Sequence, residues 1–436
     1  MASNPKGFLT LASLSQGVIN AEYAVRGAMA IRAKHIKDDL AKGVKYPFTE
    51  VTECNVGNPQ VFGQAPLTFN RQVISALMNP ELLRANIYHK DIINRAEYYL
   101  NKMGMGMGAY SDSSGHRIIK ENVCKFLEKR DGHKAYPENI FLTDGVTLGL
   151  HMVLQALMSG PKDGLMIPVP QYPLYTAILA LHNANPIPYY LNEEKGWGID
   201  MNKLQESYDE STRKGINVKA ICIINPGNPT GQVLKEHELQ QIVDFAYKNK
   251  LAILADEVYQ QNVYKDGVKF VSAKKVVAAN KDKPVDLISF NSASKGLLGE
   301  CGLRGGYFEV HNMRDEVMQQ IQKLRTMYVC SNTTGQIIVD LMVNPPTREA
   351  NATEIVEQYE REKQDLTKSL RNRAQIVTEY LKKMKNVTCN EVEGAMYAFP
   401  RLHLSQKAIE EANARKMKPD LFYTMTGKGI IWRIFC

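Results

Sequence analysis

A large α/β domain, with a mostly parallel central sheet flanked by helices, is the fold that the sequence predicts. From about residue 110 onward, short apolar runs bounded by Gly, Pro or Asp alternate with longer helical patterns. Alternation of strands and helices at this spacing is typical of a parallel sheet covered by helices. The chain has 436 residues, which at about 150 residues per domain suits two or three domains, so a second, smaller domain is expected.

The strands and helices of the large domain can be placed from the pattern of apolar residues. Short apolar runs predict strands at 140–142, 164–167, 220–224, 251–254 and 287–290. Apolar residues at helical spacing predict helices between them, near 147–158, 173–184, 235–249 and 312–326.

Both ends of the chain are expected to build the smaller α+β domain. Apolar positions over residues 17–43 predict one long N-terminal helix, after which the chain becomes extended around Cys54 and is stopped by residues 57–59. Mixed Glu and Lys over 349–385 predict a long exposed helix, and a short apolar passage follows at 395–399. We therefore expect three parts: an N-terminal helix with a segment of the smaller domain (1–109), the large domain (110–330) and the C-terminal smaller domain (331–436).

Composition excludes several classes of protein. Hydrophobic residues make up 44% and charged residues 23%, and no stretch approaches 18 consecutive apolar residues, so a membrane-spanning chain is not expected. The 54 Lys and Arg residues against 46 Asp and Glu give a net charge of +8, a mild excess that suits anionic small substrates. We interpret the short basic clusters at 382–385 and 415–418 as solvated helix faces rather than a nucleic-acid surface.

The seven cysteines are scattered and form no CxxC pair. This pattern predicts neither a disulfide framework nor a zinc site, and no metal is expected. A reducing, cytoplasmic compartment fits best. The N-terminus lacks the apolar core of a signal peptide, but it has no acidic residue before Glu22, so a transit peptide to the mitochondrial matrix is the alternative.

Two polar motifs follow predicted strands and would lie at the carboxyl edge of the sheet. The segment 225–231 (NPGNPTG), which contains Asn228, makes a rigid turn at the edge where open α/β sheets bind ligands, although it is also a good ordinary turn. Asp256 ends the apolar run before Val258 and Tyr259, and a carboxylate there needs a cationic partner or stays protonated. The plainer interpretation of Asp256 is a helix cap or a salt bridge.

A lysine and an arginine complete the set. Lys295 follows a predicted strand within 292–296 (SASKG), where partial desolvation would lower the pKa of its ammonium group and make the amine a nucleophile. The alternative is a surface lysine. Arg304 lies in what we expect to be a glycine-rich turn, 301–307 (CGLRGGY), and could pair with a phosphate. Together these residues match what pyridoxal phosphate requires: a Schiff-base lysine, a carboxylate for the pyridinium nitrogen and a phosphate cradle.

With these motifs the chain resembles the class I/II pyridoxal-phosphate-dependent aminotransferases of fold type I, and within them the alanine aminotransferases. The resemblance covers about residues 10–425. The stretches that carry it beyond the shared core are 55–60 (NVGNPQ), 110–115 (YSDSSG), 170–175 (PQYPLY), 255–262 (ADEVYQQN), 299–307 (GECGLRGGY) and 393–400 (EGAMYAFP).

The resemblance implies roles for the residues around the reactive ring. Lys295 would form the Schiff base with pyridoxal phosphate. Asp256 would keep the pyridine nitrogen protonated, and Asn228 and Tyr259 would hydrogen-bond the ring oxygen. Tyr172 would stack on the ring face. Each tyrosine could instead be a core aromatic with a solvated hydroxyl.

The resemblance also implies a phosphate site, a substrate site and a partner. The phosphate would be held by the start of the helix after residue 144, by two side chains and by a tyrosine of a second subunit, so a homodimer is implied. Gly57 and Asn228 would lie beside the substrate. The implied phosphate ligands are Gly145, Val146, Thr147, Ser292, Arg304 and Tyr110.

The C-terminal end departs from the family pattern. The resemblance implies that the chain should continue after 420–423 with a segment that completes the smaller domain and carries the arginine for the substrate carboxylate. Here the sequence ends in 427–436 (GKGIIWRIFC), and Arg433 does not match that arginine in its neighbours or spacing. We therefore expect a complete cofactor site beside an incomplete substrate site.

The activity implied by the resemblance is transamination. L-alanine and 2-oxoglutarate would give pyruvate and L-glutamate, with Lys295 moving a proton as general base and acid. Glutamate–glyoxylate exchange and other class I aminotransferase reactions are alternatives, as is a truncated paralogue that binds the cofactor without turnover.

Overall fold

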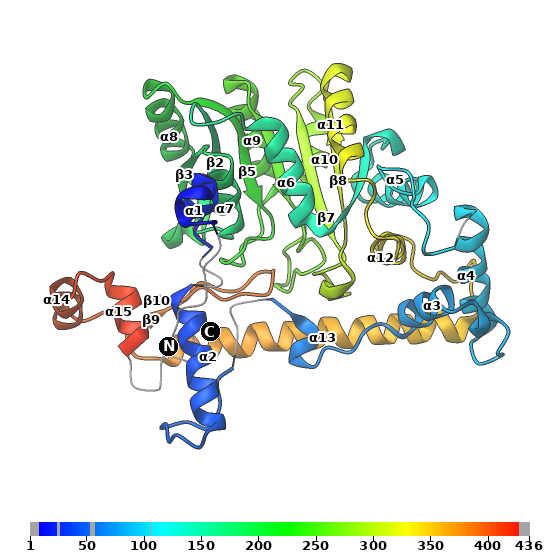
Figure 1. Cartoon of the computed structure of the whole chain (residues 1–436), viewed down its shortest axis with the longest axis horizontal. Helices are drawn as coiled ribbons and strands as arrows, with labels where there is room; N and C mark the ends of the chain where they lie inside the picture. Colours follow the sequence, from blue (N-terminus) through cyan, green and yellow to red (C-terminus); the bar gives the residue numbers. More distant parts are fainter. Residues whose placement is uncertain (1–7, 24–26, 53–56, 105, 427–436) are drawn as a thin grey trace.

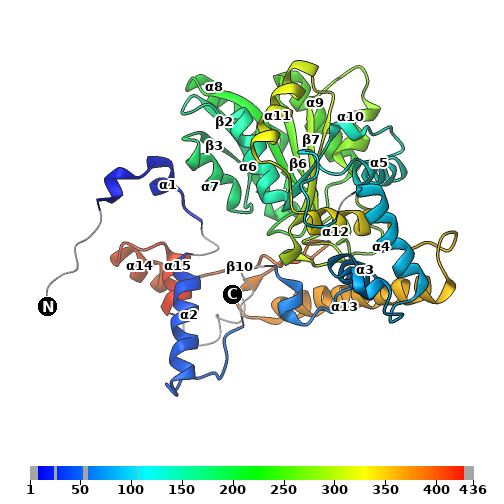
Figure 2. The same cartoon turned by 45° about the vertical axis from the view of Figure 1, so that its right-hand side comes forward.

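A computed structural model describes residues 8–23, 27–52, 57–104 and 106–426 of the chain. In the upper part of Figure 1, a twisted sheet is enclosed by helices, and the long helix α13 (Thr353–Lys383) runs beneath it. Figure 2 shows the same arrangement from a second direction, with α2 (Ala28–Ala41) and the C-terminal helices beside one end of α13. The cartoons thus show an upper α/β layer and a lower, mostly helical part.

The central sheet has eight strands in the order β1-β8-β7-β6-β5-β2-β3-β4. The pairs β3–β2, β2–β5, β5–β6 and β6–β7 are parallel, whereas β8 runs antiparallel to both β7 and β1 and β4 runs antiparallel to β3. The prediction of a mostly parallel sheet is confirmed. The strands are β1 (Ile140–Asp144), β2 (Asp163–Val169), β3 (Asn185–Asn192), β4 (Gly198–Ile199), β5 (Asn217–Ile224), β6 (Ala252–Asp256), β7 (Leu287–Ser292) and β8 (Gly305–His311).

All five predicted strands are present, but the sequence analysis missed β3, the two-residue β4 and β8. Strand β3 contains Pro186 and Pro188 and alternates exposed and buried residues, so it lacks a continuous apolar run. Strand β8 begins with Gly305 and Gly306, which we had interpreted as part of a turn, and that interpretation was wrong. A Cβ atom at Gly305 would lie 2.3 Å from the carbonyl oxygen of Gly335, so glycine is needed there for close packing rather than for a turn.

Two apolar layers enclose the sheet because buried strands present alternate side chains to opposite faces. One face packs against α6 (Gly145–Leu157), α7 (Leu174–Leu181) and α11 (Asp315–Met327). The other packs against α8 (Met201–Arg213), α9 (Glu236–Asn249) and α10 (Ala273–Ala279). The four helices predicted between strands correspond to α6, α7, α9 and α11.

A third apolar cluster lies at the β8 side of the sheet. It joins α3 (Thr68–Met78), α4 (Lys90–Met103), α5 (Arg117–Asp131) and α12 (Thr333–Val343). Helix α12 contacts β8, while α13 contacts α3 near its start and β9 (Val387–Thr388) near its end. The lower part also contains β10 (Arg401–Leu402), which pairs with β9, and the helices α14 (Gln406–Ala414) and α15 (Pro419–Thr426).

The N-terminal region differs from the prediction of one long helix over 17–43. Helix α1 (Gln16–Asn20) ends where Ala21 becomes extended, and α2 begins only after Gly27. Helix α1 packs on α7, where a Cβ atom at Gly17 would lie 2.7 Å from the carbonyl oxygen of Leu181. The break lets the chain leave α7 and reach α15, which α2 contacts. Helical periodicity cannot detect this change of partner.

Candidate active site

A cavity of about 280 Å³ opens at the carboxyl edge of the central sheet. Strands β5, β6 and β7 end there, and β8, which runs the opposite way, begins there. The cavity therefore collects residues that lie far apart in sequence. It is lined by Tyr23, Gly57, Asn58, Val146, Thr147, Leu150, Tyr172, Leu174, Asn228, Asp256, Val258, Tyr259, Ser292, Ser294, Lys295, Cys301, Arg304 and Tyr397.

One end of the cavity has the features of an anion site. Helix α6 begins at Gly145, whose φ of +73° turns the chain directly from β1 into the helix, so that the first turn, with Val146 and Thr147, faces the cavity. Backbone N–H groups at a helix N-terminus are free to bind an anion, and the helix dipole favours negative charge there. Ser292 and Arg304 line the same cavity from the end of β7 and the start of β8.

Local contacts hold the Arg304 guanidinium at this place. Its Nη1 donates to the carbonyl oxygen of Cys301 at 2.8 Å, and its Nη2 donates to that of Asp144 at 3.1 Å. Both acceptors are neutral carbonyl oxygens, and no ion pair joins Arg304 to a carboxylate within the described part of the chain. A phosphate could provide the missing counter-charge by a bidentate, charge-assisted pair.

Asp256 ends β6 with a side chain almost shielded from solvent. The hydroxyl of Tyr175 donates to its Oδ2 at 2.9 Å. Burial raises the pKa of Asp256 from 3.8 to about 6, and the nearby charge of Lys295 offsets this only in part. Because burial disfavours the ionised carboxylate, a neighbouring cation would stabilise it, and a protonated ring nitrogen would supply that charge.

Lys295 lies between β7 and Gly57, and its Nζ donates a hydrogen bond to the Gly57 carbonyl oxygen. The N–H of Gly57 donates in turn to the hydroxyl of Tyr397 at 3.2 Å. That hydroxyl lies 3.3 Å from the hydroxyl of Tyr259, and the two rings meet edge to face. A Cβ atom at Gly57 would lie 2.6 Å from the Tyr397 oxygen, so only glycine fits here.

Tyr172 also lines the cavity, and its hydroxyl shares a hydrogen bond of 2.7 Å with that of Tyr23. The two rings meet edge to face at 72°, with centroids 6.3 Å apart. Tyr23 follows α1, so the N-terminal segment contributes to the wall of the cavity. The contact with Tyr23 therefore restrains the Tyr172 ring at the cavity wall.

Together these residues fit pyridoxal 5'-phosphate. The same cavity holds an anion cradle, a buried carboxylate whose pKa is raised by burial, and a lysine amine. No group of three or more His, Cys, Asp or Glu residues in the described part of the chain could hold a metal ion. No helix among the described residues is long and apolar enough to cross a membrane.

Comparison with known proteins agrees with this geometry. Residues 81–425 match the family model described as aminotransferase class I and II. The chain belongs to this family. It is 44% identical over 430 residues to a probable mitochondrial alanine aminotransferase of Dictyostelium discoideum, covering 96% of this chain and 80% of that protein. It is also 44% identical over 420 residues to glutamate–glyoxylate aminotransferase 2 of Arabidopsis thaliana, covering 95% and 85%.

Solved structures support the aminotransferase fold of fold type I. An alanine aminotransferase from Pyrococcus furiosus superposes with a TM-score of 0.72 at 23% identity, covering 90% of this chain and 85% of that chain. An aminotransferase from Escherichia coli superposes with a TM-score of 0.70 at 22% identity, covering 94% and 90%. Family and fold together imply that this aminotransferase depends on pyridoxal phosphate.

Two of the residues selected from the sequence do not line the aminotransferase cavity. Gly145 lies behind it, where a Cβ atom would be 2.3 Å from Arg304 Nη2. Tyr110 has 76% of its surface exposed, and its predicted role toward a partner subunit stays a prediction. Arg433 and residues 53–56, which include Cys54 and the start of the NVGNPQ stretch, lie outside the described residues.

The sequence analysis missed several residues of this cavity. Cys301 and Tyr397 line the cavity, and Tyr175 lies outside it and donates to Asp256. All three lie inside motifs that we had singled out, but a motif does not tell which side chains point inward. Ser294 directly precedes Lys295 in the sequence, and this adjacency could have identified it as a cavity residue. No sequence pattern identified Tyr23 as a cavity residue, because its partner Tyr172 is 149 residues away.

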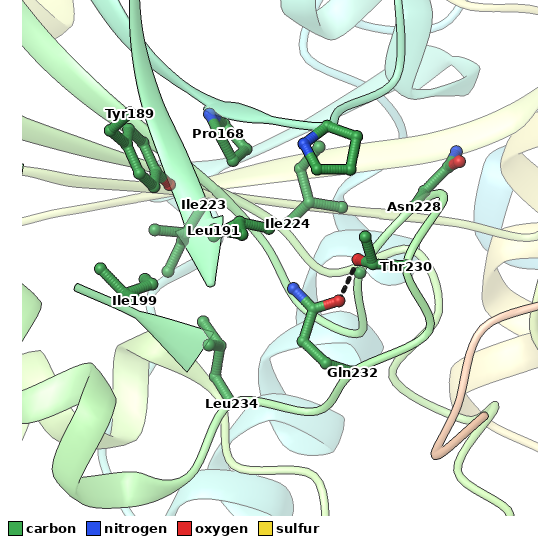
Figure 3. Close-up of a pocket in the computed structure, with 12 residues that line it drawn as sticks. Pro168, Tyr189, Leu191, Ile199, Ile223, Ile224, Asn228, Thr230, Gln232 and Leu234 are labelled. Atoms are coloured by element: carbon green, nitrogen blue, oxygen red, sulfur yellow. Dashed lines mark hydrogen bonds between the residues drawn. The ribbon is translucent and has the colours of Figure 1, made fainter. Parts of the chain in front are cut away.

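Figure 3 shows a second hollow beside the 225–231 loop. Its volume, about 10 Å³, is smaller than that of the active-site cavity. Within it the hydroxyl of Thr230 donates to Gln232 Oε1, and a Cβ atom at Gly227 would lie 1.9 Å from that oxygen. Asn225 ties the loop further by accepting from the N–H of Leu234 at 2.9 Å. These bonds stabilise the loop, so Asn228, which borders both hollows, is held at the cavity wall.

Proposed function

We propose that this aminotransferase transfers the amino group between L-alanine and 2-oxoglutarate, forming pyruvate and L-glutamate. The observation that carries the proposal is the meeting of Lys295, buried Asp256 and the anion cradle at α6 in one cavity. Relatives named alanine aminotransferase support the substrate pair. Relatives named glutamate–glyoxylate aminotransferase support glutamate and glyoxylate as the second candidate.

The chain's residues divide the work of binding the cofactor. The N–H groups of Val146 and Thr147, with Ser292 and Arg304, would hold the phosphate. Tyr172 would stack on the ring. These contacts would hold the cofactor ring in one orientation and exclude water from one of its faces.

The ring substituents would be held by Asn228, Tyr259 and Asp256. Asn228 and Tyr259 would hydrogen-bond the ring oxygen. Asp256 would hold a proton on the ring nitrogen, because its buried carboxylate stabilises a neighbouring cation more strongly than water does. Pyridoxal phosphate, when bound, supplies an aldehyde for the amino group and a cationic ring that accepts the electron pair left at the substrate Cα.

Lys295 would transfer the proton. Its amine, once exchanged for the substrate's amino group, would take the proton from the substrate Cα as general base and deliver it as general acid to the carbon that had carried the cofactor's aldehyde oxygen. The Gly57 carbonyl that binds Nζ would keep the amine near this path. Gly57 and Asn228 border the same cavity and would lie beside the substrate.

The assembly and compartment are part of the same proposal. We infer a homodimer in which Tyr110, which is largely exposed, reaches the phosphate of the partner subunit. We propose that the chain divides into residues 1–109, 110–330 and 331–436, and that the middle part binds the cofactor. We propose the cytoplasm as the compartment. The mitochondrial matrix is the alternative, since several relatives are named mitochondrial.

A visible spectrum of the purified chain with pyridoxal phosphate, recorded before and after adding L-alanine, tests the proposal. A visible band that forms with the cofactor and bleaches with alanine supports it. A band that alanine leaves unchanged would point to a cofactor-binding protein without turnover, and absence of a band in folded protein would refute the cofactor site. Lys295→Ala should abolish the band, whereas Lys162→Ala, an exposed control, should not. Comparing the rates with alanine–2-oxoglutarate and glutamate–glyoxylate decides between the two substrate pairs.

A further inference from the structure

A buried cluster of charged residues lies behind the turn that follows β6, outside the cavity. Arg130, at the end of α5, has only 15% of its side chain exposed. Its Nε and Nη2 donate to the two carboxylate oxygens of Asp131, each at 2.7 Å. Asp131 also accepts from the hydroxyl of Ser272 at 2.7 Å. The proposed aminotransferase chemistry uses none of these groups directly.

The third nitrogen of Arg130 reaches the turn itself. Nη1 donates to Gln260 Oε1 at 2.8 Å and lies 3.6 Å from Glu257 Oε2. The other oxygen of Glu257 accepts from the N–H of Ala273 at 2.7 Å. One guanidinium thus contacts two side chains of the turn, three residues apart.

The side chains of this turn alternate between two environments. Asp256, Val258 and Tyr259 line the cavity. Glu257 and Gln260 are buried on the other side, against Arg130. The N–H of Gln260 donates to the carbonyl oxygen of Glu257 at 3.1 Å, so the main chain forms a closed turn that contains Val258 and Tyr259. A displacement of either buried side chain would therefore move the cavity residues beside it.

Arg130 is itself restrained and remains charged. Its guanidinium carbon lies 5.8 Å from the ring centroids of both Phe126 and Phe270. Burial opposes its charge, but Asp131 and Glu257 overcome this effect and raise its pKa. An arginine fork of this kind can bind several oxygens at once, which a lysine ammonium cannot do with the same geometry.

We propose that Arg130 is a positioning residue that sets the orientation of Asp256 and Tyr259 through its contacts with Glu257 and Gln260. The role rests on the proposed function, because it concerns how tightly these two residues hold pyridoxal phosphate. It differs from a purely structural role, in which the ion cluster would stabilise the fold and leave the folded site unchanged.

The test compares variants with a matched control. Arg130→Gln removes the charge and the fork, Arg130→Lys keeps the charge alone, and Gln260→Ala removes one contact. Asp340→Asn is the control, since Asp340 is fully buried, does not line the cavity, and accepts from Tyr99 and from Asn122 in the cluster around α12. For each protein we would measure the thermal midpoint, the dissociation constant of pyridoxal phosphate and the pH midpoint of the visible band formed with Lys295.

A positioning role predicts that Arg130→Gln raises the dissociation constant at least about tenfold and shifts the pH midpoint of the band. Loss of a single contact in Gln260→Ala should raise the dissociation constant about fivefold. Arg130→Lys should recover part of the affinity. Asp340→Asn should lower the thermal midpoint while leaving both cofactor readouts unchanged.

A purely structural role of Arg130 predicts a different set of results. If Arg130→Gln and Gln260→Ala lower only the thermal midpoint, as the control does, the positioning role is wrong. If Arg130→Gln does not fold, Gln260→Ala and Arg130→Lys decide by the same two cofactor readouts. If the wild-type chain folds but binds no pyridoxal phosphate, the proposed function fails, and the role of Arg130 fails with it.

Discussion

The ammonium group of Lys295 donates a hydrogen bond to the carbonyl oxygen of Gly57, a residue 238 positions away in the chain. The N–H of the same Gly57 donates to Tyr397, 340 positions further along, at 3.2 Å. A single glycine therefore joins the lysine of the large domain to a tyrosine near the C-terminal end. Three distant parts of the chain therefore meet beside the Lys295 amine, the group that the proposed reaction uses.

The pKa of Asp256 leads to a pH dependence of stability. Its folded value is raised by burial from 3.8 to about 6, so the folded state binds this proton more tightly than the unfolded state does. The associated stability is present below about pH 4 and is lost as the pH rises to about 6. The loss is about 3 kcal/mol in the cofactor-free protein. Asp256→Asn should remove this pH dependence of the unfolding free energy.

Urea unfolding of both cofactor-free proteins between pH 4 and pH 8 measures this effect. The difference in unfolding free energy should grow in favour of Asp256→Asn up to about pH 6 and then level off. A difference that is constant with pH would contradict the assignment. With cofactor bound, the wild-type protein should be more stable than Asp256→Asn. The kcat/KM of the variant should fall about a hundredfold, since removing one partner of a buried ion pair costs about 3 kcal/mol or more.

Gly145→Ala should damage the proposed phosphate site. The new Cβ atom would lie 2.3 Å from Arg304 Nη2, so the guanidinium must move, and the φ of +73° is itself unfavourable for alanine. We expect at least a tenfold loss of pyridoxal-phosphate affinity, measured by titration of the visible band.

Gly215→Ala provides the control for this substitution. Gly215 has a φ of +77°, but nothing lies within 4 Å of its added Cβ atom. It should therefore lose about 1 kcal/mol of stability from backbone strain alone and keep its cofactor affinity. Equal loss of affinity in the two variants would show that the contact with Arg304 is not the cause.

Tyr397→Phe should reduce activity more than stability. The hydroxyl accepts from Gly57 N–H and meets the hydroxyl of Tyr259, so its removal leaves the glycine donor unpaired beside Lys295. Two such bonds contribute about 1 kcal/mol each, which predicts roughly a tenfold or greater loss of kcat/KM. Steady-state kinetics with alanine and 2-oxoglutarate would measure it.

Tyr189→Phe is the matched substitution outside the active-site cavity. Tyr189 is buried, whereas Tyr397 is only partly buried, and the Tyr189 hydroxyl donates to the carbonyl oxygen of Cys222 at 2.7 Å. It should lose a similar amount of stability and keep its kcat/KM. An unchanged kcat/KM in Tyr397→Phe would show that the Tyr397 hydroxyl has no part in the reaction.

The sequence could predict the strands β5, β6 and β7 because each is a buried parallel strand with a continuous apolar run. It could not predict β3, whose outward residues are polar or proline, or β8, whose first two residues are glycines. It also joined α1 and α2 into one helix, since helical periodicity continues across the break where the chain changes its packing partner.

The sequence by itself determined the chemistry at the sheet edge: a lysine, a carboxylate, an asparagine and an arginine, each placed where a buried strand ends or begins. This was possible because the carboxyl ends of parallel strands meet at one edge, so local patterns fix a shared location. The contacts of Lys295 with Gly57, Tyr172 with Tyr23 and Arg130 with Glu257 were decided only by the tertiary structure. They join residues with no shared local pattern, and packing of helices and loops from distant parts of the chain brings their side chains together.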